Sequence, residues 1–205
     1  MVILMHYAAL IVSGFIAVQI HEIARGAATV ALGDNSPKRN RAFGVKLRHV
    51  DLLGLFCIVM CGGLGWSNPV GTTPMFYRNR KRGVIIANMI PLVANMLVGC
   101  GVAFAMRFIS PSFTLKYSYI IIAMWTFCTV NISFALFNLI PVYPLDGSAV
   151  MDVILSPNAC VTYSRYEKTL QIVLILLLLF GLIGRIISPV ASTIFINLAG
   201  MSSVY

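Results

Sequence analysis

Charged residues are scarce in this sequence of 205 residues. Only 10% are Asp, Glu, Lys or Arg, against about 25% in soluble domains, and 59% are apolar. This composition excludes intrinsic disorder and disfavours a soluble globule. Acidic residues are the scarcest, with six against fifteen Lys and Arg, giving a net charge of +9. Basic cytoplasmic loops explain such an excess in a membrane protein, so we predict contact with the lipid bilayer and no nucleic-acid partner.

The sequence also lacks paired cysteines, repeats and low-complexity linkers. Its five cysteines include no CxxC pair, which argues against a disulfide framework or a cysteine zinc site. Without a linker, we predict a single integral-membrane domain over residues 1–205. The N-terminus has neither a basic region nor a small-residue cleavage site, which predicts a retained span and not a signal peptide.

Long apolar runs are present, and each of four approaches the roughly 20 residues that cross a bilayer. A fifth run, residues 52–66, is shorter and contains four glycines, which predicts a re-entrant segment. The fold class predicted is therefore an all-α polytopic membrane protein with four to five transmembrane helices and a short re-entrant element. Three alternatives stay open for residues 186–198: the end of a tilted span, a hairpin partner and an interfacial segment. The predicted spans are residues 2–20 (continuing helically to about 32), 84–106, 119–140 and 170–184, the last interrupted at Arg185.

Basic residues are distributed unevenly among the loops. If residues 52–66 are re-entrant, the loops 33–50, 67–83 and 147–169 lie on one side and carry eleven Lys and Arg together. The loop between the second and third spans carries only Arg107 and Lys116. The positive-inside rule then predicts that the eleven lie in the cytoplasm and that the N-terminus lies outside.

Three ionisable residues interrupt the first apolar run. His21, Glu22 and Arg25 lie within one helical turn of each other, where each charge costs about 2.5–3.5 kcal/mol on insertion and usually marks function. An HExxH motif uses this spacing to place two histidines on one zinc ion, with the glutamate as general base. Here Arg25 stands in the place of the second histidine.

A second polar constellation closes the third apolar run. Residues 138–147 read NLIPVYPLDG, and Pro141 and Pro144 interrupt helical hydrogen bonding there. Irregular backbone at membrane depth is tolerated only inside protein or beside a wet cavity. Asp146 lies at this break, where it is well placed to reach a metal ion or another cation; a helix-end or interfacial carboxylate is the alternative.

Together the two constellations resemble the site-2 protease family of intramembrane zinc metalloproteases, in its small bacterial type. That family carries HExxH on one span and a PLDG-type motif on a later one. The likeness extends in order from about residue 15 to residue 185. Further matching segments are LGD at 32–34, LRHVD at 47–51, GWSNPV at 65–70, RNRKRG at 78–83 and FNLIP at 137–141.

The resemblance implies a membrane metalloendopeptidase fold in a bacterial cell membrane, with its site near the cytoplasmic side. It implies zinc as cofactor, held by His21 and Asp146, with Glu22 as the catalytic base. Asn95 and Asn138 match family positions that imply contact with substrate. The substrates and partners implied are transmembrane segments of other proteins, cleaved in regulated intramembrane proteolysis. Oligomeric state and substrate identity do not follow from the sequence.

Arg25 departs from the family pattern at the position that matters most. An arginine stays protonated and offers no lone pair, and His21 with Asp146 gives two protein ligands where catalytic zinc has three. We therefore predict impaired catalysis. One hypothesis has Arg25 filling the metal position as a cation paired with Glu22 or Asp146; the alternative has it snorkelling to the interface. A rescue with His49 as substitute ligand is also open.

Three functions follow as candidates. The first is an intramembrane metalloprotease of reduced activity. The second is a non-catalytic pseudoprotease that binds transmembrane segments of partner proteins. The third is a small transporter or ion pathway, which would also explain buried His, Glu, Arg and Asp side chains, although the ordered family motifs count against it.

Overall fold

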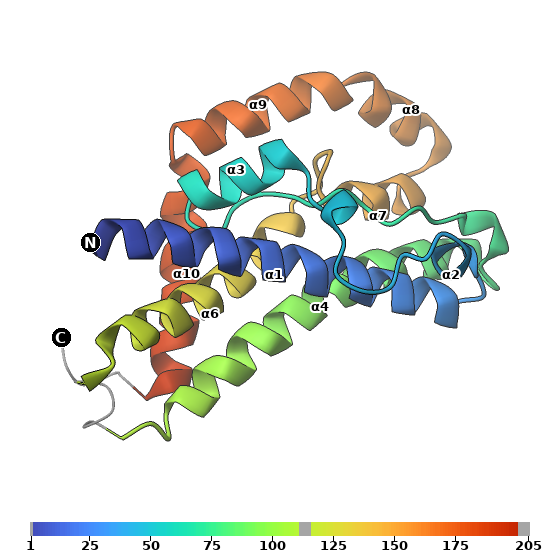
Figure 1. The fold of residues 1–205 in the computed structure, drawn as a ribbon. Coiled ribbons are helices and arrows are strands. Elements are labelled where there is room, and N and C mark those ends of the chain that lie inside the picture. Colours follow the sequence, from blue (N-terminus) through green and yellow to red (C-terminus); the bar gives the residue numbers. More distant parts are fainter. Residues whose placement is uncertain (1, 111–115, 201–205) are drawn as a thin grey trace.

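A computed structural model describes residues 2–110 and 116–200. The described residues form helices joined by turns and extended segments, with no strand among them (Figure 1), which confirms the all-α class. The elements are α1 (Val2–Ala31), α2 (Ser36–Arg39), η1 (Leu47–His49), α3 (Leu52–Met60), η2 (Pro74–Phe76), α4 (Arg80–Met106), α6 (Ser118–Asn138), α7 (Asp146–Ile154), α8 (Pro157–Arg165), α9 (Glu167–Leu179) and α10 (Leu182–Ala199).

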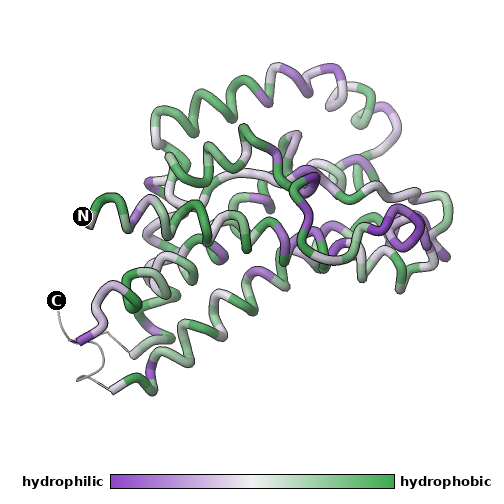
Figure 2. Tube along the Cα trace, in the orientation of Figure 1, coloured by the Kyte–Doolittle hydropathy of each residue, from purple (hydrophilic) through white to green (hydrophobic). Residues whose placement is uncertain are grey.

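Four described helices are long and apolar enough to cross a bilayer, which confirms a polytopic membrane protein. They are α1, α4, α6 and α10, and the hydropathy colouring in Figure 2 shows them mostly apolar along their length. The first three pack on one another, and α10 packs on α4 and α6. Small residues permit close approach: a Cβ on Gly99 of α4 would lie 3.0 Å from the carbonyl oxygen of Cys128 on α6.

The segment predicted to be re-entrant turns back beside α1. Its helix, α3, covers only nine residues, and the chain then reverses at Gly62 and Gly63, both with positive φ. The returning backbone lies against the start of α3, because a Cβ on Gly54 would overlap the carbonyl oxygen of Trp66. Ile58 of α3 is fully buried in a cluster with residues of α1 and α6. The returning segment, residues 64–73, therefore passes close to the centre of the bundle.

The fourth predicted span is wrong in its boundaries. We expected a run over residues 170–184 broken at Arg185, but the structure ends α9 at Leu179 and begins α10 at Leu182. The break lies at Gly181, whose φ of 68° is a left-handed conformation that favours glycine. Arg185 lies inside α10, and α10, not residues 170–184, is the candidate span. Residues 186–199 thus belong to α10, a helix separate from α9.

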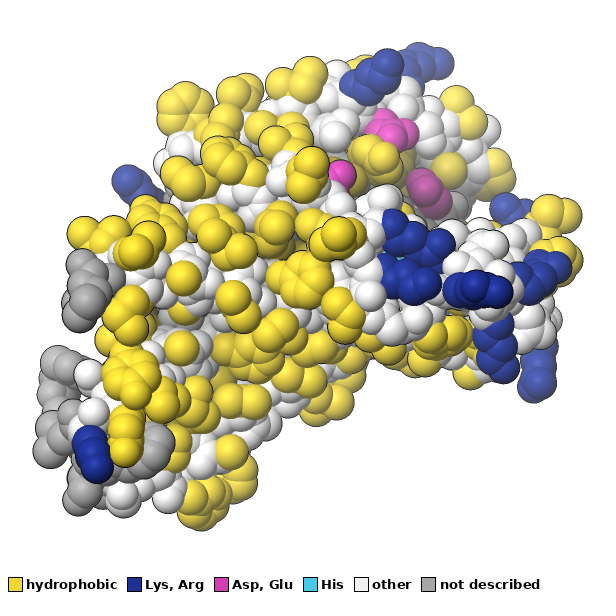
Figure 3. Space-filling view, in the orientation of Figure 1, with side chains coloured by type: hydrophobic (Ala, Val, Ile, Leu, Met, Phe, Trp, Pro, Cys, Tyr) yellow, Lys and Arg dark blue, Asp and Glu magenta, His cyan; other side chains and the backbone are white. Residues whose placement is uncertain are grey.

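Basic side chains gather at one end of the bundle. α1 ends and α4 begins there, and Figure 3 shows most of the Lys and Arg side chains on this face near that end. Hydrogen bonds tie the loops together: Asp34 accepts from the backbone N–H groups of Ser36 (2.8 Å) and Thr73 (2.6 Å). Burial would raise the pKa of Asp34, but these hydrogen bonds keep it below its ordinary value. That this end faces the cytoplasm stays a prediction.

Candidate functional site

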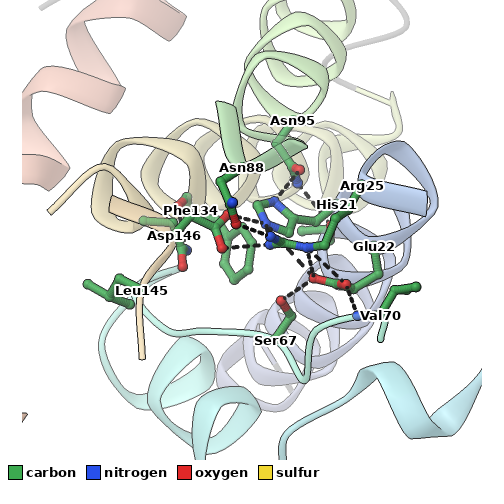
Figure 4. A network of polar contacts seen from close by, with 12 residues as sticks. His21, Glu22, Arg25, Ser67, Val70, Asn88, Asn95, Phe134, Leu145 and Asp146 are labelled. Atoms are coloured by element: carbon green, nitrogen blue, oxygen red, sulfur yellow. Dashed lines mark hydrogen bonds and ion pairs between the residues drawn. The ribbon is translucent and has the colours of Figure 1, made fainter. Parts of the chain in front are cut away.

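The charged residues of α1 meet the start of α7 in the interior. His21 and Glu22 are fully buried and Arg25 is 4% exposed, all on one stretch of α1. Asp146 is the first residue of α7, where a carboxylate is favoured by the helix dipole. The turn before it packs tightly, since a Cβ on Gly147 would overlap the carbonyl oxygens of Leu139 and Ile140. The fold thus brings residues that are distant in the sequence into one cluster (Figure 4).

His21 is fixed by contacts at both ring nitrogens. Its Nε2 lies 2.7 Å from Oδ2 of Asp146, and its Nδ1 lies 3.2 Å from Oδ1 of Asn95. Asn95 donates through Nδ2 to the carbonyl of Ala17 (2.9 Å) and to Oδ1 of Asn131 (3.2 Å). Its Oδ1 is therefore an acceptor, and Nδ1 of His21 carries the hydrogen. Asn95 is fully buried and orients His21; its predicted contact with substrate stays a prediction.

Arg25 occupies the centre of the cluster. Its Nη2 donates to Oδ1 of Asp146 (2.6 Å) and lies 2.9 Å from Nε2 of His21. Its Nε lies 3.2 Å from both carboxylate oxygens of Glu22, and Nη1 donates to Oδ1 of Asn88 (2.5 Å). The guanidinium therefore points inward and bridges both buried carboxylates. It does not reach an interface, as the snorkelling alternative required.

Glu22 is held by the returning segment as well as by Arg25. One oxygen accepts from the hydroxyl of Ser67 and the other from the backbone N–H of Val70, both at 2.6 Å. Both carboxylate oxygens are thus engaged by donors from two directions. A general base needs a free lone pair directed at the proton that it takes, and these contacts occupy the directions in which Glu22 would act.

Asp146 is kept ionised by the same network. Burial by itself would raise the pKa of Asp146, but the charges of Arg25 and His21 and their hydrogen bonds lower it to about 2. A buried carboxylate is stable only with such a partner, because an unpaired charge in a low-dielectric interior is costly. Arg25 supplies that partner at 2.6 Å.

The residues present do not fit a zinc ion. His21 Nε2 lies 2.7 Å from Oδ2 of Asp146, and the other group beside it, the guanidinium of Arg25 at 2.9 Å, offers only N–H donors. In the part of the chain that the structure describes, no three His, Cys, Asp or Glu side chains are grouped to hold a metal ion. Catalytic zinc needs three protein ligands with lone pairs directed at one point.

His49 is buried nearby but faces a different partner. Its Nδ1 lies 3.3 Å from Oε1 of Gln19, and that oxygen also accepts from the backbone N–H of Lys46 (2.8 Å). Nδ1 therefore carries the hydrogen, and Nε2 has no hydrogen-bond partner among the described residues. Burial lowers the pKa of His49, which favours the neutral ring. No contact joins it to His21 or Asp146 in the described structure, and its role as a substitute ligand stays a prediction.

Asn138 holds the returning segment in place. Its Nδ2 donates to the carbonyl of Gly65 (3.0 Å) as well as to that of Phe134 one turn earlier (2.8 Å). Asn138 is 2% exposed and lies at the end of α6. It thus connects the third span to the segment that carries Ser67 and Val70. Contact with substrate stays a prediction for this residue also.

Sequence reasoning missed several members of the cluster. Asn88 and Asn95 lie seven residues apart in an apolar helix, which places both on one face, and this spacing could have revealed Asn88. Asn131 is a buried asparagine in another apolar helix, and it accepts from Asn95. Ser67 and the N–H of Val70 carried no signal, because only the return of the chain brings them to Glu22.

Comparison with known proteins finds a family model and a curated relative that resemble this chain. The model of peptidase family M50, the site-2 proteases, matches residues 85–181, a stretch that includes Asn95, Asn138 and Asp146. This match supports the site-2 protease family for this chain. The "Putative zinc metalloprotease YwhC" of Bacillus subtilis (strain 168) is 22% identical, over 88% of this chain and 84% of its own length. No solved structure matches the chain.

These two matches support the resemblance seen in the motifs and an intramembrane metalloprotease ancestry. The family match begins after the HExxR segment, so it does not bear on Arg25. Zinc is the metal that the family name and this relative imply for an active member. Whether this member uses zinc therefore depends on the residues around Arg25.

Proposed function

We propose that this chain is a non-catalytic member of the site-2 protease family in which the guanidinium of Arg25 takes the place of the metal ion. The observation that carries the proposal is that Arg25 bonds to both carboxylates, Glu22 and Asp146, and to Asn88. A divalent ion would compensate these two negative charges in a low-dielectric site, and the guanidinium takes over part of that compensation. The same contacts leave Glu22 without a free direction in which to act as a base.

Zinc content tests the proposal most directly. The purified wild-type protein should contain far less than one zinc per chain after dialysis against trace zinc. Arg25→His introduces the missing lone pair and should raise the zinc content towards one per chain, whereas Arg25→Lys, the matched control, should not. One tightly bound zinc per wild-type chain would overturn the proposal.

Proteolysis gives an independent test. A model transmembrane substrate reconstituted with the wild-type protein should stay intact. Cleavage that disappears in Glu22→Gln would establish a metalloprotease and reject a non-catalytic role. Because Glu22 also holds Ser67 and Val70, the unfolding temperature of Glu22→Gln should be measured beside its activity.

We infer that the retained function is the binding of transmembrane segments of partner proteins. A groove of about 750 Å³ lies between α1, α4 and α6, away from the ion cluster. Apolar side chains dominate its lining, and small residues there permit close approach of another helix. Residues of the groove include Ala8, Ala9, Val12, Ser13, Val102, Ala123 and Phe127.

Site-directed crosslinking separates this groove from the rest of the lipid-facing surface. A photoreactive group at Val12, 57% exposed in the groove, should crosslink a model apolar transmembrane peptide. Leu97 on α4, another candidate span, is 67% exposed and lies outside the groove, so a probe there is the matched control. Equal crosslinking at the two positions would reject the groove as a binding site.

The geometry favours this role over a transporter. The charges of the cluster are paired with one another at 2.6–3.2 Å and are buried. An ion pathway needs groups that exchange partners with a passing ion. Proton or ion flux through reconstituted protein that is abolished by Asp146→Asn would favour transport instead.

A further inference from the structure

A second polar cavity lies outside the ion cluster, at the basic end of the molecule. Its volume is about 330 Å³, and it is lined by Asn40, Arg48, His49, Asn68, Pro69, Val70 and Gly71. Two separate segments form it: the basic loop that follows α2 and the segment that returns from α3. Its lining includes residues of the LRHVD and GWSNPV segments but not His21, Glu22, Arg25 or Asp146.

The two segments are held together by hydrogen bonds that fix the shape of the cavity. The backbone N–H of Asn68 donates to the carbonyl of His49 (2.8 Å), and its side chain donates to the carbonyl of Arg48 (2.8 Å). Nη2 of Arg48 donates to the carbonyl of Asn40 (2.7 Å). Arg48 is exposed, and a guanidinium carries five N–H groups, so donors remain for a ligand.

The charge around the cavity favours an anion. Lys46 and Arg41 lie in the same loop as Arg48, and Lys38 and Arg39 lie at the end of α2 just before it. The nearest acidic residue along the loop, Asp51, uses its side chain to accept from the backbone N–H of Gly54 (2.8 Å) at the start of α3. An arginine fork with neighbouring amides is well suited to a phosphate group.

Exposed apolar side chains alternate with these cations. Val45 is 70% exposed and Leu47 is 81% exposed, on either side of Lys46, and Leu52 beyond the loop is 83% exposed. Apolar side chains interleaved with Lys and Arg are typical of segments that lie in the headgroup region of a bilayer, with the apolar groups inserted toward the acyl chains. This pattern favours a position of the loop in the headgroup region, where phospholipid phosphates lie.

We propose that the cavity between Arg48 and Asn68 binds the phosphate of an anionic phospholipid headgroup. Arg48 and the amide of Asn40 supply the donors, while Val45 and Leu47 contact the acyl region. The cavity shares Val70 with the ion cluster, because the N–H of Val70 holds Glu22 (2.6 Å). A bound headgroup would thus rest against the segment that covers Glu22.

Lipid retention tests the site. Protein in neutral-lipid micelles, titrated with phosphatidylglycerol, should retain bound phosphatidylglycerol in native mass spectra. Arg48→Gln should weaken this retention about five-fold. Arg48→Lys, which keeps the charge but loses the fork, should weaken it less. Lys81→Gln makes the same change in charge at the exposed start of α4 and should change retention less than about two-fold.

Each further outcome has a defined meaning. Equal losses in Arg48→Gln and Lys81→Gln would show a diffuse charge effect and overturn the proposal, as would unchanged retention in Arg48→Gln. Inorganic phosphate that displaces the lipid from wild-type protein, but not from Arg48→Gln, would support the phosphate site and show that a free phosphate also fits. An acidic peptide that binds at Arg48 while phosphatidylglycerol does not would overturn it.

Discussion

Arg25 and the arginines of the basic loops carry the same charge in opposite surroundings. Arg25 is 4% exposed and bonds to Glu22, Asn88 and Asp146, whereas Arg80 and Arg82 are exposed at the start of α4. The interior arginine is placed by directional bonds to particular partners. The loop arginines need only water or headgroups, and their number counts for more than their exact neighbours. Substitutions should therefore have very different effects in the two regions.

The largest effect is expected on removing the interior cation. Arg25→Ala leaves Glu22 and Asp146 buried without the guanidinium that bonds to both, which should lower the free energy of unfolding by about 3–5 kcal/mol. Arg80→Ala, the matched change in the loops, should alter it by less than about 0.5 kcal/mol. Chemical unfolding in mixed micelles measures both.

If Arg25→Ala does not accumulate, Arg25→Lys keeps the comparison testable. Lysine retains the charge but cannot bridge Glu22, Asn88 and Asp146 at once, so a loss of about 1–3 kcal/mol is expected. Equal stability of Arg25→Lys, Arg80→Ala and wild type would contradict the directional role assigned to the guanidinium.

The next effect concerns pH and distinguishes two carboxylates. The pKa of Asp146 in the folded protein is about 2, below the unfolded value of 3.8. Its ionised form therefore stabilises the fold above about pH 4, and this contribution, on the order of 2 kcal/mol, is lost as the pH falls towards 2. Wild type and Asp146→Asn should converge in stability over that window, as followed by unfolding at each pH.

Asp152 supplies the control because its shift has the opposite sign. Burial raises the pKa of Asp152, so its ionised form destabilises the fold and protonation relieves this. The stability difference between wild type and Asp152→Asn should thus change in the opposite sense on acidification. A parallel change in the two variants would show that acid acts on the whole protein and not on the ion cluster.

The sequence carried enough information for the centre of the cluster but not for its surroundings. His21, Glu22 and Arg25 could be grouped because helical spacing places them within one turn, and Asp146 because charge in an apolar chain is costly. The contacts of Ser67 with Glu22 depend on how the chain returns from α3, which no local pattern encodes. The fold, too, was predictable from the sequence only in part.

Long apolar helices are a strong signal, and three spans, including the helical continuation of the first to about residue 32, were predicted within a few residues of α1, α4 and α6. The break between α9 and α10 was not predicted. The charge of Arg185 was the more visible signal in this apolar run, and it hid the break at Gly181. Gly181 ends the helix because its backbone adopts a left-handed conformation. Arg185 stays inside α10 because a long side chain lets a helix accommodate a single arginine.

A smaller effect on the free energy of unfolding is expected at Asn88, which contacts the buried Arg25. Asn88→Ala leaves one N–H of Arg25 without its acceptor at 2.5 Å, which should cost about 1.5 kcal/mol because the bond involves a charged group. Asn158→Ala, at an exposed position on α8, should cost less than about 0.5 kcal/mol. Unfolding in mixed micelles compares them, and equal losses would remove Asn88 from the cluster.

The smallest effect on the free energy of unfolding is expected for the exposed basic residues, and its dependence on salt distinguishes it from the effect at Arg25. Lys81→Gln should change the free energy of unfolding by less than about 0.5 kcal/mol in 0.1 M salt, since Lys81 is exposed. In 1 M salt, where the Debye length falls to about 3 Å, that difference should vanish. The loss caused by Arg25→Lys should persist, because contacts of 2.6–3.2 Å inside the protein are not screened by ions in solution. A salt-sensitive Arg25→Lys would mean that water and ions reach the cluster, and the guanidinium would then be a mobile counter-charge and not a fixed replacement for a metal ion.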